Sequence, residues 1–120
     1  MTAHDFDDML ERIFRRVPAR FRSRMKNVAV VVEEDSPNGS LLGLYQGRPL
    51  PLRSTSESFA MPDRITIFQR PHERMARDRQ DLERLVEQTL WHEIAHYFGM
   101  NEAQVRSAEN KRRRRRMYPH

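Results

Sequence analysis

Hydrophobic residues recur at helical spacing in two parts of the chain, which predicts two core-facing helices. The first covers residues 5–16, where one face collects Phe6, Met9, Leu10, Ile13 and Phe14. Pro18 interrupts this pattern. The second covers residues 78–98, with a stripe formed by Leu82, Leu85, Val86, Thr89, Leu90, Ile94 and Phe98. After Gly99 a last helix is expected from residue 101 or 102 to residue 116.

Three stretches between these helices have the composition of β-strands. Residues 28–32 form a β-branched run, which predicts a buried strand followed by a turn at residues 36–39. Residues 40–45 are a second candidate, interrupted by Gly43, which indicates either a bulge or close approach of another backbone. Residues 64–69 alternate two faces and form a third strand, which we expect Pro71 to end.

The remaining stretch, residues 46–63, predicts a long loop because it has little periodicity and holds prolines at positions 49, 51 and 62. Such a loop could form a wall or lid of a cleft, or a plain exposed connection. The element order is helix, three strands and two helices. We therefore predict an α+β fold with a short, twisted, three-stranded sheet that is mostly antiparallel or mixed, since the chain has too few crossovers for a parallel one.

The long helix contains a candidate metal site at residues 92–96, His-Glu-Ile-Ala-His. Because His92 and His96 stand four residues apart, a helix projects both imidazoles from one face, close enough to share an ion. Glu93 falls at the flank of that face, where its carboxylate can reach a water molecule at the ion without displacing it. This pattern is typical of a zinc hydrolase in which the acid beside the first histidine is the general base.

The third ligand is expected to come from outside this helix. Gly99 can adopt the left-handed conformation that turns the chain back after the helix ends. This turn makes Glu102, ten residues after His92, available to the same ion. Glu109, on the following helix, is the alternative third ligand. Two histidines and a glutamate suit zinc better than calcium or magnesium.

Length and composition define what carries this site. A chain of 120 residues is expected to form one domain, at residues 1–110, with one modest core. The chain has no cysteine, which excludes disulfides and thiolate ligands. No apolar run is long enough to cross a bilayer, and the acidic first residues lack the pattern of a secretory signal. We therefore expect a cytoplasmic protein without a membrane partner.

The formal net charge of +5 comes from the C-terminal end. Residues 111–116, which begin with Lys111 and end with Arg116, are all basic, so the rest of the chain has no basic excess. A run of like charges repels itself and is usually solvated, which predicts a flexible basic tail at residues 111–120. Contact of this run with nucleic acid or another polyanion is the alternative.

Three segments of the chain resemble the small bacterial zincin-like metallopeptidases, also called minimal zincins. They are Leu-Leu-Gly-Leu-Tyr-Gln-Gly at 41–47, Met-Pro-Asp-Arg-Ile-Thr-Ile-Phe at 61–68, and His-Glu-Ile-Ala-His-Tyr-Phe-Gly-Met-Asn-Glu at 92–102. The resemblance implies a minimal zincin-like fold with an active-site helix and a C-terminal helix. It also implies that His92, His96 and Glu102 bind one zinc ion, with Glu93 as general base.

The resemblance implies that the protein hydrolyses peptides or unfolded proteins. The alternative is a metal-stabilised binding module with little turnover. A methionine turn of the metzincin kind is not expected, because Met100 lies too near the third ligand and Met117 lies in the basic tail. The residues that could stabilise an oxyanion are Tyr45, Tyr97, Tyr118 and His72, and spacing does not choose among them.

Overall fold

The computed structural model describes residues 1–47 and 62–117, with side chains described as far as Lys111. The helices within these residues are α1 (Ala3–Arg15), α2 (Ala19–Arg22), α3 (Gln69–Met75), α4 (Arg79–Tyr97) and α5 (Glu102–Met117). The strands are β1 (Val28–Glu33), β2 (Gly43–Gln46) and β3 (Asp63–Phe68). The predicted α+β class is confirmed, and most of the loop expected at residues 46–63 lies outside the described residues.

The three strands form one mixed sheet in the order β1-β3-β2. β1 runs parallel to β3, whereas β2 runs antiparallel to it with Gly43 opposite Ile67. This arrangement confirms the expected three-stranded sheet and decides between its two forms in favour of the mixed one. It also makes β2 an edge strand, so one row of its backbone groups has no partner strand within the described part of the sheet.

Helix α3 is the element that the sequence pattern did not predict. β3 ends at Phe68, and Gln69 already begins the helix, so Pro71 lies inside α3 instead of ending a strand. Proline is tolerated there because Pro71 is the third residue of the helix, where a backbone N–H has no partner within the helix. The seven residues of α3 turn the chain from the sheet toward α4.

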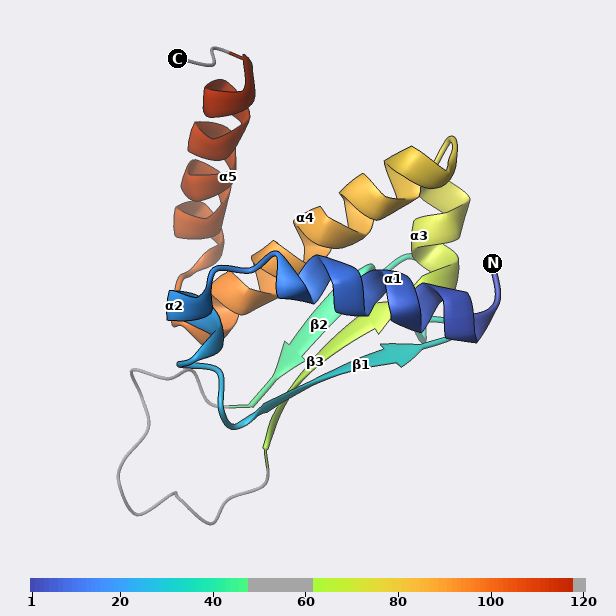
Figure 1. Ribbon diagram of the computed structural model, residues 1–120, viewed down its shortest axis with the longest axis horizontal. Coiled ribbons are helices and arrows are strands. Elements are labelled where there is room, and N and C mark those ends of the chain that lie inside the picture. The colour runs from blue at the N-terminus through green and yellow to red at the C-terminus, as the bar shows by residue number, and fades with distance from the viewer. Residues whose placement is uncertain (48–61, 118–120) are drawn as a thin grey trace.

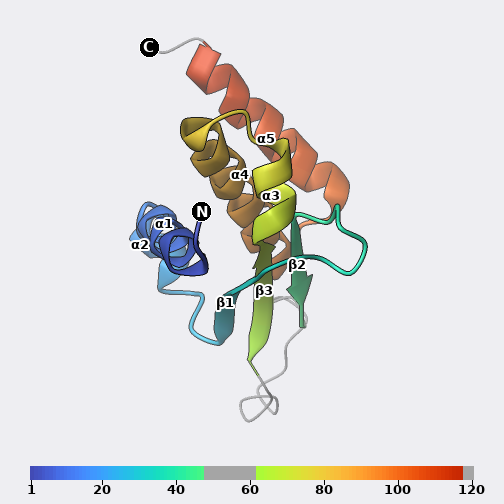
Figure 2. The ribbon, with the colours of Figure 1, turned by 90° about the vertical axis from the view of Figure 1, so that its right-hand side faces the viewer.

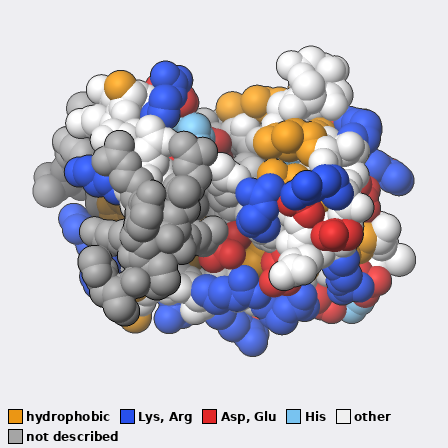
Figure 3. All heavy atoms as spheres, turned by 90° about the horizontal axis from the view of Figure 1, so that it is seen from above, with side chains coloured by type: hydrophobic (Ala, Val, Ile, Leu, Met, Phe, Trp, Pro, Cys, Tyr) orange, Lys and Arg blue, Asp and Glu red, His pale blue; other side chains and the backbone are white. Residues whose placement is uncertain are grey.

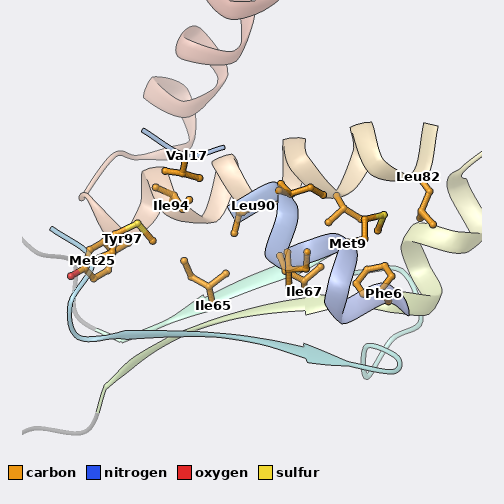
Figure 4. Close-up of a cluster of buried hydrophobic side chains, with 13 residues drawn as sticks. Phe6, Met9, Val17, Met25, Ile65, Ile67, Leu82, Leu90, Ile94 and Tyr97 are labelled. Atoms are coloured by element: carbon orange, nitrogen blue, oxygen red, sulfur yellow. The ribbon is translucent and has the colours of Figure 1, made fainter. Parts of the chain in front are cut away.

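The core lies between the sheet and two helices that cover the same face, α1 and α4 (Figures 1 and 2). Figure 4 shows side chains from α1 and α4 pointing toward Ile65 and Ile67 of β3. Fully buried side chains come from all three elements, namely Phe6, Met9, Ile13, Ile65, Ile67, Val86, Leu90 and Ile94. The hydrophobic stripes predicted for the two helices therefore face one common core.

Ion pairs join α1 and α4 at the edge of this core. Arg16 lies 2.8 Å from Glu83 and 3.4 Å from Glu87, and Arg12 lies 3.2 Å from Glu83. Seen from above, basic and acidic side chains are intermixed on the surface (Figure 3). These pairs are half-exposed, so each contributes about 1 kcal/mol or less, and the packed core determines where α4 lies.

Helix α5 leaves the end of α4 and extends away from the sheet (Figure 1). Its first half contacts α4 through Val105, which is 1% exposed. Within the described part of the chain, every helix is too short or too polar to cross a lipid bilayer.

Candidate metal centre

The C-terminal half of α4 presents the two histidines on one face, as the four-residue spacing predicts. The helix begins at the cap residue Asp78, whose side chain accepts a hydrogen bond from the backbone of Asp81 over 2.8 Å. The rings of His92 and His96 lie 5.0 Å apart between centroids. Another face of α4 packs into the core through residues such as Ile94. This packing fixes the position of the helix and therefore of the two imidazoles.

A glycine turn ends α4 immediately after the histidines. Gly99 has a φ of 88°, and its N–H donates to the carbonyl of His96 over 2.9 Å. The N–H of Met100 donates to the carbonyl of Ala95 over 3.0 Å. These two bonds form a Schellman motif, which requires a left-handed residue that only glycine adopts without strain. The turn sends the chain back, so Glu102 at the start of α5 lies beside the histidines.

Three side chains converge on one point at this turn. Oε1 of Glu102 lies 3.3 Å from Nε2 of His92 and 2.7 Å from Nε2 of His96. One ligand atom from each of the three residues lies within 4.8 Å of the others. A tetrahedral zinc site separates its ligand atoms by about 3.4 Å, so the first pair already has that spacing and the second needs to open by roughly 0.7 Å. These three side chains could therefore hold one ion, and two imidazoles with one carboxylate are a donor set that suits zinc.

The other ring nitrogen of each histidine binds an acceptor on the protein. Nδ1 of His96 lies 3.1 Å from the carbonyl of Met100, and Nδ1 of His92 lies 2.9 Å from Oε1 of Glu109. A carbonyl or carboxylate oxygen accepts a hydrogen bond, so Nδ1 donates in each case, and Nε2 is the nitrogen that would offer its lone pair to an ion. Metal-binding histidines use this arrangement, which fixes the tautomer and the direction of the ring. Glu102 thus contacts Nε2 of both histidines, whereas Glu109 contacts Nδ1 of His92.

The electrostatics of the centre depend on how deeply each group is buried. Burial opposes a charge on His92, but its hydrogen bond to Glu109 and the nearby carboxylates of Glu93 and Glu102 raise its pKa overall. Glu102 is exposed, and although desolvation opposes its charge, its hydrogen bonds to the two histidines lower its pKa. The carboxylates of Glu93, Glu102 and Glu109 thus all favour a positive charge at His92, and they would favour a divalent cation there in the same way.

Glu93 is 8% exposed, and this burial raises its pKa despite the opposing effect of the two histidines. A backbone hydrogen bond from Tyr45 of β2 also reaches its carboxylate. The approach of β2 depends on Gly43, because a Cβ there would lie 2.6 Å from Cγ2 of Thr89 and 3.3 Å from Cγ of Glu93. The sequence offered a bulge or the close approach of another backbone at this glycine, and the structure shows instead the close approach of β2 to side chains of α4.

The centre lies in an open cleft between β2 and α4. Two adjoining hollows share Leu41, Gly43, His92 and Glu93 along its floor and wall. The hollow toward the end of α4 is also lined by His96 and Glu102, and the other is lined by Leu85 and Met75. Met75 was missed from the sequence because α3 is too short to show a periodic pattern.

The described candidates for oxyanion stabilisation bind other groups. The hydroxyl of Tyr45 donates to Asp63 over 2.5 Å, and that of Tyr97 donates to the carbonyl of Arg24 over 3.2 Å. His72 is fully buried, with hydrogen bonds to Phe68 and Thr89. Among the three candidates that the structure describes, Tyr45 alone lines the cleft. Tyr118 lies outside the described residues.

The chain belongs to the zincin-like metallopeptidase family, whose sequence model matches residues 25–112. The fold is similar to that of a solved structure, a conserved hypothetical protein from Thermo thermophilus, with a TM-score of 0.55 and 27% sequence identity. That similarity covers 80% of this chain and 92% of the other. A comparison with curated proteins found no match. The family match confirms the resemblance that the three sequence segments indicated.

Proposed function

We propose that this protein is a zinc-dependent peptidase in which His92, His96 and Glu102 bind one ion and Glu93 is the general base. The observation that supports it best is the convergence of two Nε2 atoms on one carboxylate oxygen, at 3.3 and 2.7 Å, beside a buried acid. Membership of a metallopeptidase family agrees with this assignment. A zinc ion bound there would act as a Lewis acid and lower the pKa of a water molecule toward neutrality.

Glu93 has two tasks in this mechanism. Its carboxylate accepts a proton from the attacking water, and it later returns that proton to the departing amine. Because burial raises its pKa, Glu93 is a stronger base than an exposed carboxylate and can hold the proton between the two steps. The backbone hydrogen bond from Tyr45 keeps its carboxylate directed along the cleft.

The substrate would be an extended peptide bound beside β2. An edge strand offers its backbone N–H and C=O groups to a further strand, and β2 borders the cleft that contains the histidines and Glu93. Main-chain hydrogen bonds would then supply much of the affinity. The adjoining hollow, with Leu41, Leu85 and Met75 in its lining, would receive an apolar side chain of the peptide.

Metal analysis combined with the Glu93→Gln substitution tests the proposal. We expect about one zinc per chain in both proteins, and hydrolysis of unstructured peptides in the wild type alone. Glu87→Gln is the matched control, because it makes the same change on the same helix at a residue that pairs with Arg16 outside the cleft. This control should keep both zinc and activity.

Two outcomes would count against the proposal in different ways. Bound zinc without turnover in the wild type would reject the peptidase and leave a metal-binding module. Zinc that stays bound after Glu102→Ala would instead reject the assigned ligand set.

A further inference from the structure

A second concave surface lies between α2, α4 and α5. This apolar groove has a volume of about 410 Å³, and its lining side chains include Phe21, Trp91, Ile94, Phe98, Val105 and Ala108. Phe21 packs edge-on against Trp91 and Phe98, with ring centroids 5.8 and 6.0 Å apart. None of the residues assigned to zinc binding or proton transfer lines the groove. The metal centre therefore does not account for it.

Helix α5 separates the groove from the metal centre. Val105 and Ala108 line the groove and Glu102 contacts the histidines, whereas Glu109 lies between the two, since it lines the groove while its carboxylate binds His92. A ligand in the groove would thus contact α4 and α5 without entering the cleft beside β2. This separation allows occupancy of the two surfaces to be measured independently.

Basic side chains flank the groove. The guanidinium of Arg20 lies 4.9 Å from the centre of the Phe21 ring, and that of Arg24 lies 5.6 Å from the centre of the Phe98 ring. Lys111 is itself part of the lining. The acid in the lining is Glu109, whose carboxylate already binds His92.

Within the described part of the chain, these cations differ from Arg12 and Arg16 in having no acidic partner. Arg12 and Arg16 pair with glutamates of α4, whereas no carboxylate among the described residues pairs with Arg20, Arg24 or Lys111. The sequence from residue 12 to residue 32 contains no Asp or Glu at all. An apolar groove between unpaired cations complements a ligand that is apolar on one side and acidic on the other.

We propose that this groove is a docking site for an acidic amphipathic peptide segment of a partner protein. Apolar side chains of the segment, spaced one helical turn apart, pack in the groove against the rings of Phe21, Trp91 and Phe98. Its carboxylates pair with Arg20, Arg24 and Lys111 at the sides. A flat anionic membrane would meet the same cations, but it would leave the volume of the groove unfilled.

Trp91 provides a direct measurement, because it is the single tryptophan of the chain and lines the groove. The probe is a synthetic helical peptide with Leu and Phe at positions i, i+3, i+4 and i+7 and Glu at most other positions. We expect a saturable change in the fluorescence of the full chain. A peptide with Lys in place of every Glu should bind at least about tenfold more weakly, because it meets like charges.

Paired substitutions test the role of the cations. The double variant Arg20→Gln and Arg24→Gln should bind the acidic peptide about tenfold more weakly, because two exposed ion pairs with the peptide are lost. Arg64→Gln combined with Arg70→Gln is the matched control on β3 and α3, and it should change the affinity less than about twofold. Thermal unfolding of both double variants checks that each is folded. The Glu93→Gln protein should bind the probe with the affinity of the wild type, because Glu93 does not line the groove.

Three results would overturn this proposal. One is a fluorescence signal that does not change with the acidic peptide. Another is equal affinity for the acidic and the basic peptide, which would make the groove a non-specific apolar surface. The third is a response to vesicles of anionic phospholipid in the absence of any response to the peptide, which would assign the groove to a membrane surface. Failure of zinc binding or hydrolysis would leave the proposal standing.

Discussion

Oε1 of Glu109 lies 2.9 Å from Nδ1 of His92, on the side of the ring opposite to the nitrogen that faces Glu102. The two glutamates are seven residues apart on α5, so two turns of one helix bring both carboxylates to the same imidazole. The sequence offered them as competing third ligands. If His92 binds zinc as we propose, their positions at different ring nitrogens would give them two separate tasks, with Glu109 orienting the ring.

Removing the Glu109 carboxylate should therefore weaken zinc binding without abolishing it. We expect Glu109→Ala to lower the zinc affinity by roughly 10–100-fold, the usual effect of losing the acceptor behind a metal-binding histidine. Glu102→Ala should cause a larger loss, since it removes a ligand. Competition with a chromophoric chelator measures both affinities.

Glu109→Gln is the control for this prediction, because its amide oxygen can still accept the proton on Nδ1 of His92. Its loss of affinity should be smaller than that of Glu109→Ala. If Glu109→Ala removed zinc as completely as Glu102→Ala, then Glu109 would be a ligand after all.

Adding a methyl group at Gly43 should disturb the packing of β2 against the side chains of Thr89 and Glu93. The new Cβ would lie 2.6 Å from Cγ2 of Thr89, which is closer than two carbon atoms can approach. We expect Gly43→Ala to lower the free energy of unfolding by about 1–3 kcal/mol, as overpacking does. Denaturant titration measures this change. Leu44→Ala, at the exposed neighbouring position, should lower the free energy of unfolding by less. Equal decreases in the two variants would show that the contact with Thr89 is unimportant.

The part of the site that the sequence predicted is the part governed by local geometry. The spacing of His92 and His96 fixes their common face because the helix repeat is constant. The turn at Gly99 follows from the need for a left-handed residue after the last turn of a helix. Glu102 follows three residues after that glycine, so its position beside the histidines also depends on a short segment of chain.

The features that the sequence did not predict depend on contacts between distant segments. The parallel pairing of β1 with β3 is a choice among strand orders that alternation of side chains does not encode. Pro71 was interpreted as a breaker, although the first turn of a helix accepts proline. The spacing of Glu109 from Glu102 placed it near the histidines, but which ring nitrogen it meets depends on how α5 packs on α4.

The buried imidazole of His72 should make the protein less stable in mild acid. Its Nδ1 lies 2.6 Å from the carbonyl of Phe68 and its Nε2 lies 2.8 Å from the hydroxyl of Thr89. Burial lowers the pKa of His72, and the hydrogen bond to Phe68 only partly offsets this effect. As the pH falls through about 6.5, the unfolded chain takes up this proton before the folded protein does.

The contribution of neutral His72 to the free energy of unfolding is thus complete above the pKa that this histidine has in the unfolded chain. It decreases as the pH falls below that pKa. For this one group the slope should approach about 1.4 kcal/mol per pH unit. Denaturant titrations from pH 8 to pH 5 should show a steeper dependence in the wild type than in His72→Gln. Comparing the two proteins separates His72 from the histidines of the metal centre, and equal slopes would contradict its titration.

The apolar hollow beside Glu93 should select the side chain next to the bond that is cut, if the protein is the peptidase we propose. Met75 is 57% exposed and lines this hollow together with Leu41 and Leu85. Its exposure means that a substitution there should change the free energy of unfolding by less than about 0.5 kcal/mol. An effect of such a substitution on cleavage would therefore indicate that Met75 contacts the substrate.

We expect Met75→Glu to lower kcat/KM for peptides with leucine or phenylalanine at that position by about tenfold, since a charge replaces part of an apolar wall. Peptides with alanine at the same position should be affected much less. Met75→Leu keeps the apolar surface and should retain the preference of the wild type. Mass spectrometry of a peptide mixture identifies the cleaved bonds, and an unchanged preference in Met75→Glu would show that the substrate side chain binds elsewhere in the cleft.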